Sequence, residues 1–317
     1  MWAMLTRRTL LGSAVLAGCR RSRGTVIGMV PKGTSNSFWK TVHAGALSAI
    51  DGKGLTLEWN APALETDSTR QMQIVESMLN RRVSGIILAP VDRKALVALV
   101  ERAASSSIPV VIFDSAIDTP RIVSYVATDN REGGRMAARR MAEILGGRGK
   151  VAIVGFTIGS AATMEREDGF QEELRKFPGM QMVDLRYSNS DRAVAMNITE
   201  NIMSAHPDLA GIFADNEGSS TGAAQAVKNR AARLKLVAFD TTPQLINDMK
   251  SGVVDSIVVQ NPFRMGSESA RVMLEHLDGR TVPSSIDSGA RLITLADLDK
   301  PEIRQFLNPP IERYLGG

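Results

Sequence analysis

Short runs of apolar and β-branched residues alternate with longer amphipathic stretches along most of the chain. About ten such runs have the length of buried strands, at residues 25–30, 55–60, 85–90, 109–114, 124–129, 150–156, 182–188, 211–216, 234–240 and 256–261. The stretches between them have helical periodicity, as in 67–82, where Met72, Val75, Met78 and Leu79 share one face. This alternation predicts parallel sheets covered by helices on both faces. Because about ten strands exceed one ordinary sheet, we expect two doubly wound α/β domains.

Composition narrows the class of protein without changing this picture. The 317 residues are 44% hydrophobic and 23% charged, which excludes disordered, collagen-like and coiled-coil chains. The single cysteine excludes an internal disulfide. The net charge of +4 includes Arg7 and Arg8, and no basic cluster supports nucleic-acid binding.

The first 23 residues have the order of a targeting segment. Arg7 and Arg8 precede the apolar run 9–15, which is too short to span a bilayer, and Leu-Ala-Gly-Cys follows at 16–19. This tetrapeptide resembles the lipobox of bacterial lipoproteins. We therefore predict a signal peptide at 1–18, a lipid anchor on Cys19 and a lipidated tether at 19–23. The paired arginines fit a twin-arginine signal or a plain Sec signal equally well.

Polar residues gather in the loops that follow the predicted strands. These loops include 32–39, Asp114, 215–217, 240–242 and 260–261, and Arg166 lies in the helix after 155–160. In open α/β sheets ligands bind at the carboxyl ends of the strands. Carboxylates, amides, a guanidinium and flat aromatic rings together suit a neutral, polyhydroxylated ligand, because they pair with hydroxyls and pack on apolar sugar faces.

Several short motifs, in order and spacing, resemble a known family, the periplasmic sugar-binding proteins of the ribose-binding type. The motifs are SNSFW at 35–39, IPVVIFD at 108–114, ATDN at 127–130, EREDGF at 165–170, AHPD at 205–208, FADN at 213–216 and VAFDTTP at 237–243. The resemblance implies a type I periplasmic-binding-protein fold, with two lobes joined by a three-strand hinge. It places the N-terminal lobe at 24–127 and 261–288, and the C-terminal lobe at 128–260 and 289–317.

The resemblance also implies eight ligand-binding residues, at Asn36, Phe38, Trp39, Asp114, Arg166, Asn216, Asp240 and Gln260. Each also has a structural interpretation. The two aromatic residues could be core, the aspartates and Asn216 could be helix caps or turns, and Gln260 could be an ordinary strand residue. Arg166 could pair with Glu165 or Asp168 on a solvated helix face.

Three positions depart from the ribose-binding pattern. Ala89 stands before Pro90 where that family has asparagine, Ser115 follows Asp114 where it has arginine, and Ser190 replaces an aromatic residue. We therefore expect a monosaccharide or polyol other than ribose. Replacement contacts are open to Lys32, Thr34, Ser115, Glu217 and Asn261.

Enzymatic activity is not expected. Residues 218–222 fit G-x-S-x-G, but the turn before them is filled by 215–217, which places Ser220 inside a helix instead of at a strained tip. The glycine-rich segment 146–150 lacks the spacing of a phosphate-binding loop. With three histidines and one cysteine, no metal site or cofactor is predicted.

The resemblance implies an extracytoplasmic protein, in the periplasm or on the cell surface, that captures its ligand by lobe closure. Its partners would be the permease and ATPase subunits of an ATP-binding-cassette (ABC) importer, and we expect a monomer. An alternative is a sugar- or autoinducer-sensing subunit that presents its closed form to a membrane receptor or kinase. A transcription-factor core of related fold would begin with a DNA-binding helix-turn-helix, whereas this chain begins with a signal sequence.

Overall fold

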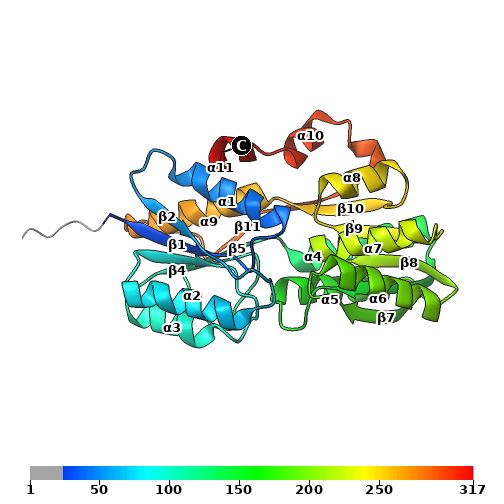
Figure 1. Ribbon diagram of the computed structural model, residues 1–317, viewed down its shortest axis with the longest axis horizontal. Helices are drawn as coiled ribbons and strands as arrows, with labels where there is room; N and C mark the ends of the chain where they lie inside the picture. Colours follow the sequence, from blue (N-terminus) through cyan, green and yellow to red (C-terminus); the bar gives the residue numbers. More distant parts are fainter. Residues whose placement is uncertain (1–23, 317) are drawn as a thin grey trace, which may run out of the picture.

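The computed structural model describes residues 24–316, which form two lobes side by side (Figure 1). The calls on the signal peptide and on Cys19 lie outside the described residues. The first lobe has a six-stranded sheet in the order β11-β5-β4-β3-β1-β2. Its elements are β1 (Val26–Val30), α1 (Ser37–Ile50), β2 (Thr56–Trp59), α2 (Ser68–Arg81), β3 (Gly85–Leu88), α3 (Val97–Ser105), β4 (Val110–Phe113), β5 (Ser124–Ala127), α9 (Pro262–Leu277) and β11 (Ser285–Asp287).

The second lobe repeats this plan with a sheet in the order β12-β10-β9-β8-β6-β7. Its elements are α4 (Asn130–Ile144), β6 (Arg148–Gly155), α5 (Ala161–Leu174), β7 (Gly179–Tyr187), α6 (Arg192–Ala205), β8 (Leu209–Ala214), α7 (Glu217–Asn229), β9 (Lys235–Phe239), α8 (Pro243–Lys250), β10 (Ser256–Gln260) and β12 (Ala290–Thr294). The chain passes between the sheets after β5, after β10 and after β11. The predicted α/β fold with two doubly wound lobes is confirmed.

The ten predicted apolar runs correspond to β1 to β10, whereas the edge strands β11 and β12 were not predicted. β12 also departs from the expected parallel arrangement, because it pairs antiparallel with β10. Both strands are partly exposed, so they lack the continuous apolar run that marks a buried strand.

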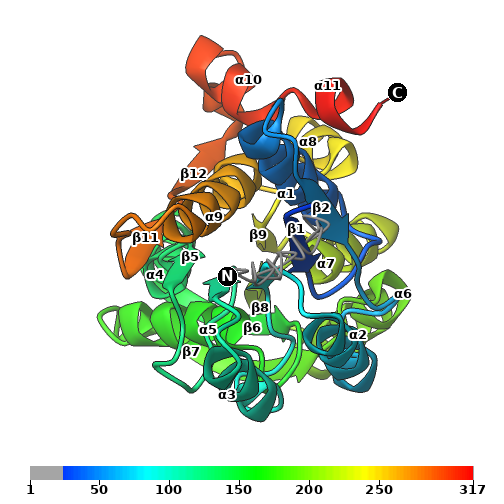
Figure 2. The same ribbon diagram turned by 90° about the vertical axis from the view of Figure 1, so that its left-hand side faces the viewer.

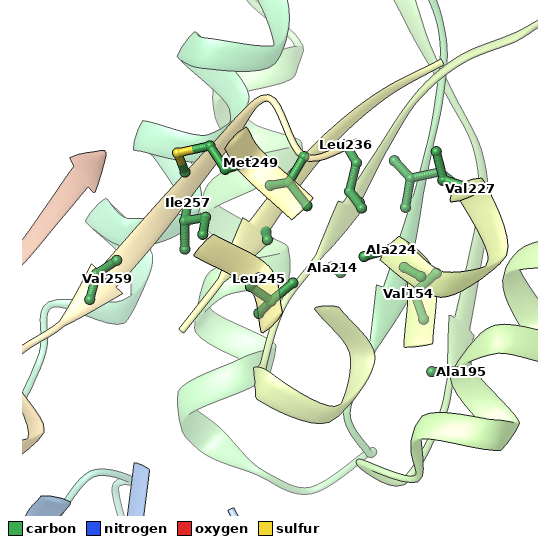
Figure 3. Packing of buried hydrophobic residues seen from close by; sticks show 14 of the residues in the cluster. Val154, Ala195, Ala214, Ala224, Val227, Leu236, Leu245, Met249, Ile257 and Val259 are labelled. Carbon is green, nitrogen blue, oxygen red and sulfur yellow. The ribbon is translucent and has the colours of Figure 1, made fainter. Parts of the chain in front are cut away.

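Alternate residues of each central strand pack on opposite faces of its sheet. In β8, Ile212 and Ala214 belong to one apolar cluster and Phe213 to the cluster on the other face. Figure 3 shows the first of these clusters, in which Leu245 and Met249 of α8 lie with Ile257 of β10. Because both faces are buried, the carboxyl ends of the strands are the free edge at which polar side chains collect.

Glycines bring one helix pair in each lobe into backbone contact. A Cβ on Gly134 of α4 would lie 2.0 Å from the carbonyl oxygen of Arg166 in α5, and a Cβ on Gly169 would lie 2.0 Å from that of Arg131. In the first lobe Gly45 of α1 and Gly266 of α9 have the same relation to the facing helix. Gly134 therefore fixes how closely α5, which carries Arg166, approaches α4.

A C-terminal tail after β12 contacts both lobes. A short 3₁₀ helix (Leu295–Asp297) leads to α10 (Pro301–Leu307), whose Ile303 is buried in the core of the second lobe. The next helix, α11 (Ile311–Leu315), packs against α1, and the Tyr314 ring lies 6.1 Å from the Phe263 ring of α9. The tail thus runs along the outside of both lobes (Figures 1 and 2). The boundary drawn from the sequence assigned all of 289–317 to the second lobe, whereas α11 contacts the first.

Within residues 24–316, no helix is long and apolar enough to span a membrane.

Replacing Gly134 with alanine is expected to destabilise the protein by about 1–3 kcal/mol, because the new methyl group overlaps the Arg166 carbonyl. Helix propensity alone would favour alanine by about 1 kcal/mol, so the sign of the change reports the close contact. Urea unfolding measures it. The exposed helix variant Ser204→Ala should stay within about 0.5 kcal/mol of wild type, and a Gly134→Ala protein as stable as wild type would contradict the packing described.

Candidate ligand-binding cleft

A cleft lies between the carboxyl edges of the two sheets. Its walls come from both lobes and comprise Lys32, Asn36, Phe38, Trp39, Glu65, Asp114, Phe156, Ala162, Thr163, Arg166, Asn216, Glu217, Asp240 and Gln260. The structure therefore brings together all eight residues that the sequence singled out. A wider hollow under the C-terminal tail shares Phe38, Asp240 and Gln260 with this cleft, so the two spaces adjoin at the hinge.

On the first lobe, the loop from β1 to α1 carries Asn36, Phe38 and Trp39 into the cleft. Asn36 occupies the N-cap position of α1, but its side chain does not cap the helix. Instead its amide donates to Glu65 Oε1 at 2.7 Å, and Trp39 Nε1 donates to the same oxygen at 2.5 Å. Phe38 and Trp39 meet edge to face and also belong to the core of this lobe. The aromatic pair therefore has both the lining role and the core role.

Glu65 is a cleft residue that the sequence reasoning missed. It lies in the loop between β2 and α2, so the rule that polar residues after strands line the ligand edge already covered it. Burial raises the pKa of Glu65 to about 7, although the bond from Trp39 and the nearby charge of Lys32 oppose this.

Lys32 supplies a cation beside Asp114. The Lys32 Nζ atom lies 2.9 Å from Asp114 Oδ2, and both side chains are about 95% buried. The residue after Asp114, where the ribose-binding pattern has arginine, is Ser115, and its hydroxyl accepts a hydrogen bond from the Ala162 backbone of the other lobe at 3.1 Å. Among the candidate replacements, Lys32 is thus the one that pairs with Asp114.

Arg166 is held rigidly on the second lobe. Its Nε atom donates to Asn130 Oδ1 and its Nη1 atom to the Asp215 carbonyl, each at 2.8 Å. The guanidinium carbon lies 3.8 Å from the centre of the Phe239 ring, which agrees with a cation–π contact. Arg166 is almost completely buried, so the alternative of a solvated surface ion pair is wrong. Asp168 pairs with Arg131 instead.

Asp240 is the centre of the polar network on this lobe. Gln260 Nε2 donates to its Oδ1 at 2.8 Å, the Glu217 backbone donates to its Oδ2 at 3.2 Å, and Arg166 Nη1 lies 4.0 Å away. Burial raises the pKa of Asp240 to about 6, and the charge of Arg166 opposes that rise. The cap of α8 is Thr242, so Asp240 is left free to face the cleft.

Asp114 and Asp240 occupy equivalent turns in the two lobes, directly after β4 and β9. Both have left-handed backbones, with φ of 61° and 65°. This conformation costs a non-glycine residue on the order of 1 kcal/mol and is often found at functional sites. The two strained turns direct two carboxylates into one space.

Asn216 and Gln260 combine structural and cleft-facing roles. The Asn216 Oδ1 atom caps α7 by accepting from Ser219, as the structural interpretation predicts, while its amide donates to Ser190 Oγ at 2.8 Å. Gln260 accepts from Thr128 Oγ1 at 2.8 Å while it donates to Asp240. Each amide therefore orients cleft groups from a fixed backbone position.

The charges of the cleft disfavour an anionic ligand. Its lining contains the cations Lys32 and Arg166 and the four carboxyl groups of Glu65, Asp114, Glu217 and Asp240. An added anion would raise an excess of negative charge in a poorly solvated space, at a high electrostatic cost. Neutral hydroxyl groups, in contrast, can donate to the carboxylates and accept from the cations.

Groups typical of catalysis have structural partners. The Ser220 hydroxyl lies inside α7, where it donates to the Ala214 carbonyl at 3.2 Å and accepts from the Phe239 backbone at 3.0 Å. This is the position inside a helix that the sequence predicted for it. The described part of the chain contains no cluster of three or more His, Cys, Asp or Glu side chains that could hold a metal ion.

Fold and cleft together define a two-lobed solute-binding protein with its site at the facing edges of the sheets. The family model for the periplasmic binding protein domain matches residues 27–281, and the chain belongs to this family. It is 27% identical over 268 residues to the ribose import binding protein of Bacillus subtilis, covering 84% of this chain and 87% of that one. The resemblance to the ribose-binding type is thus confirmed.

Solved structures agree with this assignment. An ABC transporter solute-binding protein from Agrobacterium vitis with bound D-fucose has a TM-score of 0.87 and 33% identity, covering 89% of this chain and all of that one. A carbohydrate transporter solute-binding protein from Agrobacterium radiobacter in complex with D-arabinose has a TM-score of 0.88 and 30% identity, covering 90% of this chain and all of that one.

The raised pKa of Glu65 makes stability depend on pH. Between about pH 4.5 and pH 7 the folded chain keeps a proton on Glu65 that the unfolded chain has released, so rising pH should weaken folding by on the order of 3 kcal/mol. Glu65→Gln removes this contribution. We expect its unfolding free energy to rise relative to wild type between about pH 5 and pH 8, as measured by urea unfolding without ligand. The exposed control Glu143→Gln should follow wild type, and equal pH slopes for Glu65→Gln and wild type would refute the buried state of Glu65.

Proposed function

We propose that this chain is an extracytoplasmic solute-binding lipoprotein that captures a neutral monosaccharide or polyol between its lobes and delivers it to an ABC importer. The observation that carries the proposal is the facing pair Asp114 and Asp240, one carboxylate from each lobe, with a buried cation beside each. A ligand that binds both carboxylates holds the lobes together. Binding and closure are then the same event.

The cleft matches the chemistry of a sugar. Each aspartate can accept from adjacent hydroxyls, while Lys32 and Arg166 donate to hydroxyl or ring oxygens. The rings of Phe38 and Trp39 offer apolar surface to the C–H face of the sugar. The interlocked side chains fix these groups in place, so little conformational entropy is lost on binding.

We propose a sugar other than ribose as the cargo. The basis is the departure at Ala89, Ser115 and Ser190 from the ribose-binding pattern, together with the use of Lys32 in place of an arginine after Asp114. Support comes from the neighbouring structures with D-fucose and D-arabinose, both neutral monosaccharides. The charge balance of the cleft argues against sugar acids and sugar phosphates as cargo.

Cargo delivery and anchoring complete the proposal. The closed form would dock on a permease whose ATPase drives uptake, and the chain itself would act as a monomer without catalytic activity. A lipid on Cys19 would hold the protein at the membrane in the periplasm or on the cell surface, which raises its local concentration near the permease.

A screen of the purified protein against neutral sugars, polyols, sugar acids and sugar phosphates tests the binding role, with thermal shift first and calorimetry on each hit. We expect a neutral sugar or polyol to stabilise the fold by roughly 2.7 kcal/mol at about 100 times its dissociation constant. Asp240→Ala should weaken that binding by about 100-fold or more, because it leaves Arg166 without its buried partner.

The control for this change is Asp208→Ala, which removes an exposed carboxylate paired only with Lys150. It should bind as tightly as wild type. Preference for a sugar phosphate, or unaltered affinity in Asp240→Ala, would contradict the proposed site.

The anchor is tested separately by Cys19→Ser expressed in a bacterium that processes lipoproteins. Without the sulfur that carries the lipid, we expect the protein to move from the membrane fraction to the soluble fraction. Immunoblotting of the two fractions measures the change. A variant that stays with the membranes as wild type does would refute the lipid anchor.

A further inference from the structure

The helices α1 and α5 are equivalent in the two lobes, and neither is capped by its own N-cap side chain. Each is the first helix after the corresponding strand of its sheet, β1 or β6. The N-cap residue of α1 is Asn36, which donates to Glu65 and Ser190. The N-cap residue of α5 is Ser160, whose hydroxyl accepts from Lys32 of the other lobe at 3.2 Å. Both N-cap residues face the cleft, so their helices need other acceptors.

The acceptor for α1 comes from the second lobe. Glu217, the first residue of α7, is 2% exposed, and its carboxylate meets the first turn of α1. Its Oε2 atom accepts from Phe38 N at 3.1 Å and from Ser37 Oγ at 2.9 Å, and its Oε1 atom accepts from Ser37 N at 3.2 Å. A carboxylate at a helix N-terminus also interacts favourably with the helix dipole.

The acceptor for α5 comes from the first lobe. Ser115 Oγ is completely buried and accepts from Ala162 N in the first turn of α5 at 3.1 Å. The capping is therefore reciprocal, because each lobe supplies the acceptor that caps the equivalent helix of the other. Six other helices of the described chain are capped by the residue that precedes them: α2, α4, α6, α7, α8 and α9.

Both acceptors adjoin residues of the proposed ligand site. Ser115 follows Asp114 directly, and the Glu217 backbone donates to Asp240 Oδ2. Lobe movement that brings the two aspartates together therefore also brings the two acceptors onto their helices. When the lobes separate, the first turns of α1 and α5 lose these partners and turn to water.

We propose that Glu217 and Ser115 form a closure latch, in which each lobe caps a helix of the other and thereby slows the release of bound ligand. This inference rests on the proposed function, because the latch acts on the same cleft. Neither residue needs to touch the ligand. Both act as positioning residues that stabilise the closed arrangement.

The test compares ligand dissociation and association rates for wild type, Glu217→Gln, Ser115→Ala and the double variant, using the sugar found by the screen. We expect Glu217→Gln to release the sugar roughly tenfold faster and Ser115→Ala about threefold faster, with association rates within about twofold of wild type. Small-angle X-ray scattering without sugar should give a larger radius of gyration for the double variant, and saturating sugar should restore the wild-type value.

The matched control is Asp67→Ala, which removes a cap made within one lobe, where Asp67 Oδ1 accepts from Arg70 N at 2.8 Å. It should lower the melting temperature of the ligand-free protein and leave the dissociation rate unchanged. Wild-type dissociation rates in both latch variants would overturn the proposal.

Failure of the proposed function has a different signature. If wild type binds none of the sugars, that function fails, and scattering from the ligand-free proteins then decides the latch. A larger radius of gyration in the double variant supports it, and an unchanged radius overturns it.

Discussion

Buried polar groups at the facing edges of the two sheets must find partners, and the opposite lobe supplies many of them. Lys32 of the first lobe reaches Ser160 of the second at 3.2 Å, and Glu217 of the second reaches the backbone of Ser37 and Phe38 in the first. A polar group left without such a partner would cost about 1–3 kcal/mol, and more when charged. The positions of the lobes and the polar order of the cleft therefore depend on each other.

The duplicated architecture explains why the site is divided equally between the lobes. In each lobe a strand ends in an aspartate with a left-handed backbone, and a glycine contact holds the first helix against its neighbour. Asp114 and Asp240 are consequently presented from opposite sides by similar turns. A neutral ligand with hydroxyl groups on both faces satisfies this geometry, because each aspartate can bind a different face.

Much of this arrangement could be predicted from the sequence. The buried strands have long apolar runs, and the residues that follow them are polar because the carboxyl edge of a parallel sheet is where the chain leaves the core. Asn36, Asp114, Arg166 and Asp240 were found by that rule together with the family resemblance, and the structure brings them into one cleft. The edge strands β11 and β12 escaped prediction, because short, half-exposed strands carry no periodic apolar signal.

The contacts between lobes were harder to predict, because they depend on two segments far apart in the chain. The pairs Glu217–Phe38 and Ser115–Ala162 become neighbours only when the lobes meet, and nothing local in either segment indicates the other. Glu65 is a different case, because its loop follows a strand and was open to the same rule. The contact of α11 with α1 is set by the length and packing of the tail, which short-range patterns do not encode.

A crystal structure of the protein with its sugar tests the central claim most directly. The account predicts one sugar between the lobes, within hydrogen-bond distance of both Asp114 and Asp240, with the Phe38 and Trp39 rings beside its apolar face. A sugar bound to one lobe alone, or outside the cleft with Lys32 and Asp114 still enclosed, would contradict the claim that ligand capture and lobe closure are one event.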